Sequence, residues 1–493
     1  MSFKVLFSNH VVLPCSEKGL KVVAAAVAIE GADIVAVEEI SYDDFVNQAF
    51  QDECIRGAAR NHKATGGVEL VDYADYILCP AFVNAHTHLS MCAFRGIGGM
   101  AAAKDNLVED LFYKLETSIT RDDVYAFTKV GAFESLLCGA GTVWDHYYFG
   151  QTCADAVADV GLTAVIAPTL QDEGGPGAVW LEQQLQDTEA LTDEKYAKKG
   201  IVAAVGAHAT DTVSASLWRQ ASQLASQKNI PLHAHVAQSL EEFERSQDRY
   251  GKTPVEFLDD TGALEGGSGF LLVHGLFLTD ADLARLNPAR HTLGYCPFSQ
   301  IQFGFPTGNM AFAAHGLNAV LGTDAAACND TMNVQQELRL VAGGPSFSSS
   351  TSLAMERFRA SGDAADAKQV WTERVQAFEK RHPLSGPAAL LSSVWKTPGT
   401  LHPGLHVGEI AVGAKANLLV VDLEHPALWP ATDVLHALAM SDVATALHAV
   451  ILQGDYMGHP GDFHGSIVRS ELYMAACAEA NIRLKALLQR LGL

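Results

Sequence analysis

The sequence predicts a mixed α/β fold, a (β/α)8 barrel with a small β-sandwich built from both ends of the chain. One observation predicts the barrel: between residues 82 and 323, short apolar runs end in a polar residue and are followed by longer helix-like segments. A second observation predicts the sandwich, because the regions before residue 79 and after residue 405 contain strand-like runs with no such rhythm.

The repeat contains eight apolar, β-branched runs. They end at His86, His146, Thr169, His208, His235, His274, Cys296 and Asp324. Segments such as 106–137 and 214–228 separate them, and their Ala, Leu, Glu, Gln and Lys content favours helices. Eight strands alternating with helices over about 240 residues match the roughly 250 residues typical of a (β/α)8 barrel.

The two ends of the chain are expected to pair with each other. Runs such as KVLFSN and ADIVAVEE lie near the beginning, and NLLVVDL and HAVILQGD lie after residue 405. We therefore predict a composite β-sandwich from residues 1–79 and 390–465, a barrel over residues 80–389, and a C-terminal helix over residues 466–493. The helical periodicity of SELYMAACAEANIRLKALLQRLGL indicates that this last helix packs against the rest of the protein.

Composition limits the partners. A formal net charge of -23 argues against nucleic acid and anionic membranes, which both need basic surface, and favours a small neutral or cationic substrate. The nine cysteines are scattered and form no CxxC pair, so neither a disulfide framework nor a thiolate zinc site is indicated. Apolar stretches fall short of the roughly 20 residues that a spanning helix needs. We expect a soluble cytoplasmic protein.

Polar residues at the predicted strand ends form the candidate site. His86 and His88, in PAFVNAHTHLSM, are two residues apart and can project from a strand toward one ion. The strand ends of a barrel meet at its C-terminal face, where catalysis is found. Five further residues converge there with this pair: His146, His208, His235, His274 and Asp324. Each histidine alone is more often a hydrogen-bonded core or surface residue, but their convergence favours a metal site.

Three or four nitrogen and oxygen ligands with one position left for water describe a catalytic divalent ion. Such an ion lowers the pKa of its bound water to about 7, which makes hydroxide available at neutral pH. Asp324 is the carboxylate placed to hold and relay the proton. His233 and His235 both lie on the fifth predicted strand, and spacing alone does not choose between them.

The chain resembles the amidohydrolase superfamily, in particular its branch of 5-methylthioadenosine/S-adenosylhomocysteine deaminases, guanine deaminases and triazine chlorohydrolases. The resemblance is carried by PAFVNAHTHLSMCAFRG, GAHATDTVS, PLHAHVAQS, LLVHGLFLT and LGTDAAACNDTMNVQQELRLV. It implies one divalent metal ion, zinc first and iron or manganese as alternatives, with His86, His88, His235 and Asp324 as ligands. It also implies a homo-oligomer.

The same resemblance implies roles for other residues. His274 would lie beside the metal water and help orient and protonate it, and Asp324 would also serve as the base. His208 would contact the substrate. Glu109 would bind ribose hydroxyl groups, with a solvated helix-face glutamate as the alternative interpretation. His146 is a further pocket donor in this prediction, with a packing role as its alternative.

Gln238 departs from the family pattern, which usually has a glutamate that protonates a ring nitrogen. Glutamine can form hydrogen bonds but cannot deliver a proton. We expect a metal-dependent hydrolase, foremost a deaminase that uses metal-bound hydroxide on an amino-substituted purine, pterin or triazine. One alternative keeps the site but hydrolyses a carbon–chlorine bond, or cleaves a carbamate, urea or amide. The other is a non-catalytic metal-binding pseudoenzyme.

Overall fold

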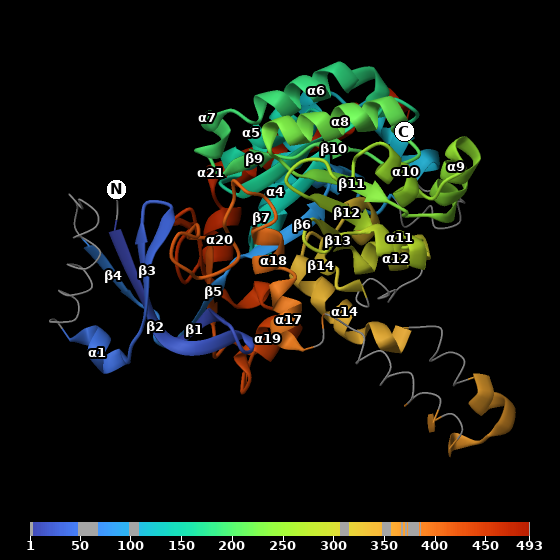
Figure 1. The fold of residues 1–493 in the computed structure, drawn as a ribbon. Coiled ribbons are helices and arrows are strands. Elements are labelled where there is room, and N and C mark those ends of the chain that lie inside the picture. Colours follow the sequence, from blue (N-terminus) through green and yellow to red (C-terminus); the bar gives the residue numbers. More distant parts are fainter. Residues whose placement is uncertain are drawn as a thin grey trace.

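The computed structural model describes residues 3–47, 68–97, 108–305, 315–347, 356–365, 368–369, 372, 384 and 386–492. Its parallel strands lie beside a separate β-rich part that contains the beginning of the chain (Figure 1). The predicted mixed α/β content is confirmed.

Two parallel sheets hold the strands of the repeat, and each of the eight predicted runs contains strand residues. The first sheet contains β6 (Phe82–Thr87), β7 (Ala140–Tyr147), β8 (Thr163–Leu170), β9 (Ile201–Ala203) and β10 (Gly206–Ala207). The second contains β11 (Leu232–Val236), β12 (Phe270–His274), β13 (His291–Tyr295) and β14 (Asn318–Leu321). Isolated parallel bridges join the two sheets at both edges: Thr87 with Asp324, Val205 with Leu232, and Ala209 with His235.

Residues of β6, β7, β8, β11, β12 and β13 are buried along their whole length, which explains why these strands read as continuous apolar runs. Parallel strands are covered on both faces, and helices follow them along the chain (Figure 1). They include α4 (Arg121–Leu137), α5 (Gly150–Val160), α6 (Leu181–Ala190), α8 (Ala215–Lys228), α9 (Leu240–Tyr250), α10 (Pro254–Asp260), α11 (Asp280–Arg285), α12 (Pro297–Phe303) and α14 (Val334–Phe347).

Local sequence fixes several helix starts. Thr120, Thr253 and Thr279 each form a capping box with an acidic residue three positions later, which satisfies backbone N–H groups at the N-termini of α4, α10 and α11.

Other helical elements are α1 (Tyr42–Val46), η1 (Leu89–Phe94), η3 (Val108–Phe112), α3 (Tyr113–Glu116), η4 (Pro176–Trp180), α7 (Glu194–Ala197), α13 (Ala326–Asn329), α17 (Pro387–Ser392), α18 (Lys396–Gly399), α19 (Val434–Met440), η6 (Ala444–Ala446) and α20 (Phe463–Val468).

Strands from both ends of the chain share one eight-stranded sheet, in the order β17-β16-β15-β5-β1-β2-β3 with β4 paired to β1. Its strands are β1 (Phe3–Cys15), β2 (Gly19–Glu30), β3 (Asp33–Glu39), β4 (Val68–Asp72), β5 (Tyr76–Pro80), β15 (Leu418–Asp422), β16 (Leu447–Leu452) and β17 (Asp455–Met457). The antiparallel pairing of β5 with β15 joins the two ends. The sandwich form and the domain boundaries stay predictions.

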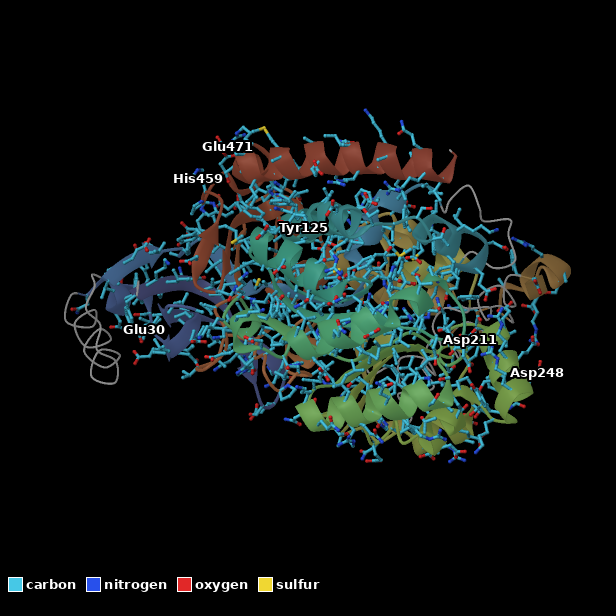
Figure 2. The ribbon with its side chains drawn as sticks, turned by 90° about the horizontal axis from the view of Figure 1, so that it is seen from above. Glu30, Tyr125, Asp211, Asp248, His459 and Glu471 are labelled. Atoms are coloured by element: carbon cyan, nitrogen blue, oxygen red, sulfur yellow. The ribbon has the colours of Figure 1, made fainter. Side chains whose placement is uncertain are left out.

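Helix α21 (Glu471–Leu491) ends the described chain and packs beside α4 (Figure 2). The rings of Phe133 and Tyr473 lie 5.2 Å apart between the two helices, and Arg490 pairs with the buried carboxylate of Asp123. Within the described residues, no helix is both long and apolar enough to cross a membrane.

Candidate metal centre and its pocket

The ends of four strands position the predicted metal ligands and the predicted catalytic residue His274. His86 lies near the end of β6, His235 lies in β11, and His274 is the last residue of β12. His88 follows β6 directly, and Asp324 follows β14 after a short link. His274 and Asp324 both have positive backbone φ angles, 74° and 60°, which are uncommon outside glycine and often mark functional sites.

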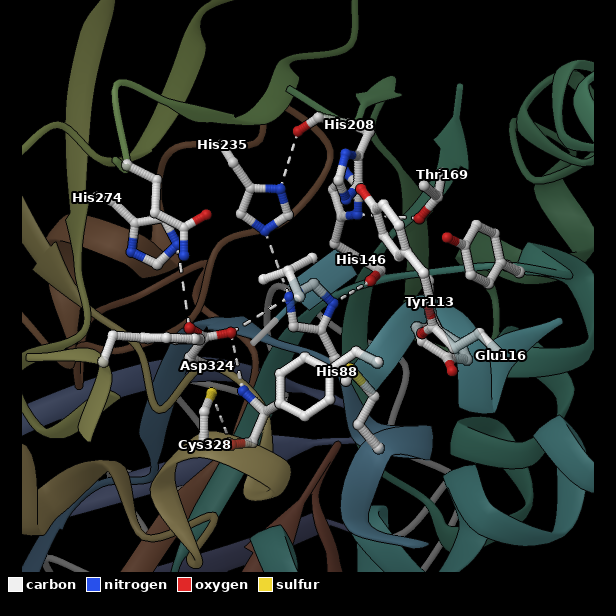
Figure 3. A pocket seen from close by; sticks show the side chains of 18 residues that line it. His88, Tyr113, Glu116, His146, Thr169, His208, His235, His274, Asp324 and Cys328 are labelled. Atoms are coloured by element: carbon white, nitrogen blue, oxygen red, sulfur yellow. Dashed lines mark hydrogen bonds and ion pairs between the residues drawn. The ribbon is translucent and has the colours of Figure 1, made fainter. Parts of the chain in front are cut away.

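The structure brings these five side chains together, and Figure 3 shows His88, His235, His274 and Asp324 among them. Nε2 of His88 lies 3.3 Å from Oδ1 of Asp324, and Nε2 of His86 lies 3.6 Å from the same oxygen. Nε2 of His235 is 3.4 Å from Nε2 of His88, while Nε2 of His274 is 3.9 Å from Oδ2 of Asp324. One nitrogen from each histidine and one carboxylate group therefore face a common point.

The hydrogen bonds that His235 and His88 form on their outer nitrogens leave their inner nitrogens suited to a cation. Nδ1 of His235 donates to the carbonyl of His208 over 2.8 Å, and Nδ1 of His88 donates to the carbonyl of His146. A neutral imidazole that is protonated on Nδ1 has a lone pair on Nε2, so the two Nε2 atoms present lone pairs to each other. A divalent ion between them would satisfy both lone pairs.

His86 supports the same conclusion. Its Nε2 is buried and has no hydrogen-bond partner among the described residues. Its Nδ1 lies 2.9 Å from Nε2 of His233, so His233 contacts the outer nitrogen of His86, whereas His235 faces the common point. The structure thus distinguishes the two histidines that spacing alone could not separate.

Asp324 outweighs the effect of burial at His88 and raises its pKa. Burial keeps the other three site histidines neutral. It lowers the pKa of His86 to about 4 and the pKa of His274 to about 3, and it holds the pKa of His235 well below its usual range. Burial alone would raise the pKa of Asp324, but His86, His88 and His274 outweigh it and hold that pKa well below the usual range. Neutral imidazoles and an ionised carboxylate are the forms that bind metal ions.

Asp324 is also fixed by neutral donors. The hydroxyl of Ser299, on α12, donates to Oδ2 over 2.6 Å, and the backbone N–H of Ala325 donates to Oδ1 over 2.9 Å. These contacts set the orientation of the carboxylate toward His88 and His274.

A pocket opens above these residues. Its lining combines the predicted ligands with aromatic and polar side chains: His88, Met91, Val108, Phe112, Tyr113, Glu116, His146, Tyr147, Tyr148, Thr169, His208, His235, Gln238, His274, Phe303, Asp324, Ala325 and Cys328. None of these is a lysine or an arginine. The described lining therefore offers no lysine or arginine to a phosphate or carboxylate on a substrate.

Three of the four predicted substrate-binding residues line this pocket. Nδ1 of His146 lies 3.0 Å from the hydroxyl of Thr169, and Nδ1 of His208 lies 2.7 Å from the hydroxyl of Thr212. Gln238 also lines the pocket, and its backbone N–H donates to the buried carboxylate of Glu242 over 2.7 Å.

The fourth predicted residue, Glu109, lies elsewhere. Its carboxylate pairs with Arg245 of α9, and it is absent from the described lining of the pocket. Besides Asp324, the carboxyl group in the described lining belongs to Glu116, which the sequence prediction missed. Glu116 falls in the i, i+3, i+4, i+7 pattern of Phe112, Leu115 and Ile119, and an acidic residue on such an apolar face is the signal that could have identified it.

Glu116 is 4% exposed. Burial raises the pKa of its carboxyl group to about 7, although the nearby hydroxyl of Tyr147, His88 and the hydroxyl of Tyr148 oppose part of that rise. Near neutral pH this side chain can therefore donate or accept a hydrogen bond.

Comparison with known proteins gives consistent relatives. A family model described as "Amidohydrolase family" matches residues 77–355. A 5-methylthioadenosine/S-adenosylhomocysteine deaminase of Caldanaerobacter subterraneus is 28% identical over 431 residues, covering 86% of this chain and 91% of that protein. A 5'-deoxyadenosine deaminase of Methanothermobacter thermautotrophicus is 27% identical over 418 residues, covering 83% and 88%.

Solved structures show a shared fold. An adenosine deaminase from Xanthomonas campestris with bound zinc superimposes with a TM-score of 0.75 at 21% identity, covering 99% of this chain and 98% of that one. The atrazine chlorohydrolase of Arthrobacter aurescens TC1, complexed with zinc, gives 0.72 at 18% identity over 98% and 100%.

Proposed function

This chain belongs to the amidohydrolase family, and from that premise we propose that it is a metal-dependent deaminase of an amino-substituted nitrogen heterocycle. One observation carries the proposal: three buried imidazole nitrogens and the carboxylate of Asp324 face one point at the base of a pocket. The deaminase names of the relatives that align over most of this chain support the same reaction.

We infer that His86, His88, His235 and Asp324 hold one divalent ion. Zinc is the first choice, because imidazole nitrogen and carboxylate oxygen suit it and because two of the structural neighbours contain zinc. When bound in such a site, zinc lowers the pKa of a water ligand to about 7 and so supplies a nucleophile at neutral pH.

The protein's own residues handle the protons. Asp324 is ionised and fixed by Ser299, so its Oδ2 can accept the proton of the attacking water. His274 lies 3.9 Å from that oxygen and is buried in the neutral form, and it can orient the water and help return the proton to the departing amine. His208, His146 and Gln238 supply hydrogen bonds that orient the ring.

A chlorohydrolase with the same residues is the second candidate. Gln238 favours it, because a displacement that does not need ring protonation loses nothing when glutamine replaces the usual glutamate. The carbamate, urea and amide hydrolases keep the same site, and no observation on this chain favours them.

The test is product analysis on metal-analysed protein. Ammonia release is measured across aminopurines, their nucleosides, aminopterins and aminotriazines, and chloride release across chlorotriazines. We expect ammonia from at least one aminated ring. Chloride without ammonia would select the second candidate, and neither product from metal-loaded protein would indicate a non-catalytic metal-binding protein.

We also infer that the two parallel sheets close into one (β/α)8 barrel. The parallel bridges at both sheet edges support closure, and the shared fold with the adenosine deaminase supports the same architecture. A composite sandwich from the two chain ends is supported by the pairing of β5 with β15. A cytoplasmic homo-oligomer stays a prediction.

A further inference from the structure

The pocket wall away from the predicted metal ligands has its own construction. It consists of Phe112, Tyr113 and Glu116, from the segment after η1, together with Tyr147 and Tyr148 at the end of β7. Figure 3 shows Tyr113 and Glu116 across the pocket from Asp324 and His274. We call these five residues the far wall.

Gln171 fixes two tyrosines of the far wall. The hydroxyl of Tyr148 donates to Oε1 of Gln171 over 3.0 Å, and Nε2 of Gln171 donates to the hydroxyl of Tyr113 over 3.2 Å. The backbone N–H of Gly177 donates to the same Oε1 over 3.0 Å. Gln171 and Tyr148 are buried, so this network is not loosened by solvent.

The wall is closed from behind. A Cβ atom at Gly177 would lie 2.5 Å from Oε1 of Gln171 and 2.6 Å from the ring of Tyr148. Real Cβ atoms do not approach other atoms so closely, so Gly177 lies directly against the network. A bulky substrate could not move Tyr148 backward without displacing this backbone.

Two polar groups of the far wall still face the cavity. The hydroxyl of Tyr147 is buried beside the carboxyl group of Glu116 and has no other hydrogen-bond partner among the described residues. Glu116 itself lines the pocket. This pair of polar groups can both donate and accept hydrogen bonds, so a ligand with a complementary polar edge would be favoured.

The space between the two walls is small. The cavity volume is about 70 Å³, whereas pockets that enclose drug-sized ligands measure roughly 300–1,000 Å³. At about 10–15 Å³ for each water position, the space corresponds to about five to seven water molecules. A flat ring system is on that scale, but a ring with an attached sugar is not.

We propose that this pocket takes a free heterocyclic base and excludes the corresponding nucleoside, with Glu116 and Tyr147 hydrogen-bonding the ring edge remote from the amino group. The inference rests on the proposed function and narrows its substrate class. A sugar would need space that Tyr113 and Tyr148 fill. The hydroxyl groups of both tyrosines are already hydrogen-bonded to Gln171. On this point the chain differs from relatives that are named for nucleoside substrates.

The test compares matched pairs on the zinc-loaded protein: adenine with adenosine, and guanine with guanosine. Binding is measured by calorimetry, and turnover by ammonia release. We expect at least one base to bind 100-fold more tightly than its nucleoside. Base binding without ammonia would uphold this inference and overturn the deaminase. Nucleoside binding that equals or exceeds base binding, or binding of neither, would overturn the inference.

Substitutions at the far wall sharpen the test. Tyr113→Ala should raise the nucleoside-to-base affinity ratio at least tenfold, because it removes a ring from the cavity, whereas Tyr113→Phe should leave the ratio within a few-fold of wild type. The control is Tyr125→Ala on α4, where the tyrosine pairs with Asp159 outside the pocket. An unchanged ratio in folded Tyr113→Ala would show that the wall does not exclude the sugar. The wild-type measurement decides the question alone if that variant does not fold.

Discussion

The two sides of the pocket are built in different ways. The metal side takes its residues from strand ends, where backbone pairing holds His86, His235 and His274 in place. The far wall takes Tyr113 and Glu116 from a short helical segment that follows a π-helical turn, η3. Side-chain hydrogen bonds to Gln171 hold this wall together.

Because of this difference, we expect the residues that carry out the reaction to be separate from those that select the substrate. The strand ends can hold one ion and one proton-transferring carboxylate, and many substrates could react there. The segment after β6 determines how much space remains above them. Functions differ between proteins of one fold largely through such connecting segments, so we expect the far wall to select the substrate of this chain.

The largest expected effect is a loss of activity, which should come with loss of zinc on the metal side and without it on the far wall. Asp324→Ala or His86→Ala should lower kcat/KM at least 1,000-fold and reduce bound zinc in parallel, since each variant removes a predicted ligand. Glu116→Ala should lose activity while zinc stays near one per chain. Zinc content by elemental analysis and steady-state rates provide the measurement. Full zinc content in Asp324→Ala, or zinc loss in Glu116→Ala, would contradict the division.

The metal side could be predicted because its signal is short-range. Histidines at strand ends and the HxH spacing of His86 and His88 require only the alternation of a strand and the convergence of parallel strands. The alternating strands and helices were accessible for the same reason. The choice between His233 and His235 was not, because it depends on the contact between His233 and His86, which are 147 residues apart.

The far wall could not be predicted in the same way. Glu109 and Glu116 both lie in a segment with helical composition, and which one reaches the pocket depends on the π-helical turn at Val108–Phe112. A π-helical turn changes the face on which later residues lie. Glu109 is also held by Arg245, a contact across 136 residues of chain. Neither feature is visible in local sequence.

An effect of medium size is expected on the pH dependence of folding stability, through Glu116 of the far wall. Because the pKa of Glu116 is about 7 in the folded protein and 4.5 without burial, the folded state keeps a proton that the unfolded chain releases between these values. Stability due to this group therefore falls as pH rises from about 4.5 to about 7, by about 3 kcal/mol. Glu116→Gln removes that loss, so the variant should gain stability relative to wild type across this window.

Thermal unfolding of both proteins at pH 5 and pH 8 measures the gain, because other titrating groups contribute equally to wild type and variant. Exposed Glu244→Gln on α9 is the control, since its charge is solvated in both states. A stability difference that does not change with pH in Glu116→Gln would show that this carboxyl group is not the buried acid described above.

The smallest effect lies behind the metal side, at His233. For His86 to present a lone pair on Nε2, its Nδ1 must carry the proton and donate it to Nε2 of His233 over 2.9 Å. His233→Leu leaves that donor unpaired and favours the tautomer that cannot bind zinc. Partners of this kind typically contribute 10–100-fold to metal affinity, so we expect a loss of that size, largely restored in His233→Gln, which keeps an acceptor.

Competition with a zinc chelator measures the affinity, and thermal unfolding of the zinc-free proteins shows whether a variant is simply less stable. His402→Leu is the matched control: His402 is also buried and hydrogen-bonds the carbonyl of Ala203 over 2.9 Å, but it does not contact a predicted ligand. Equal zinc affinity in His233→Leu and wild type would mean that strand geometry alone orients His86. In that case the metal side would need no side-chain support, and its contrast with the far wall would be sharper still.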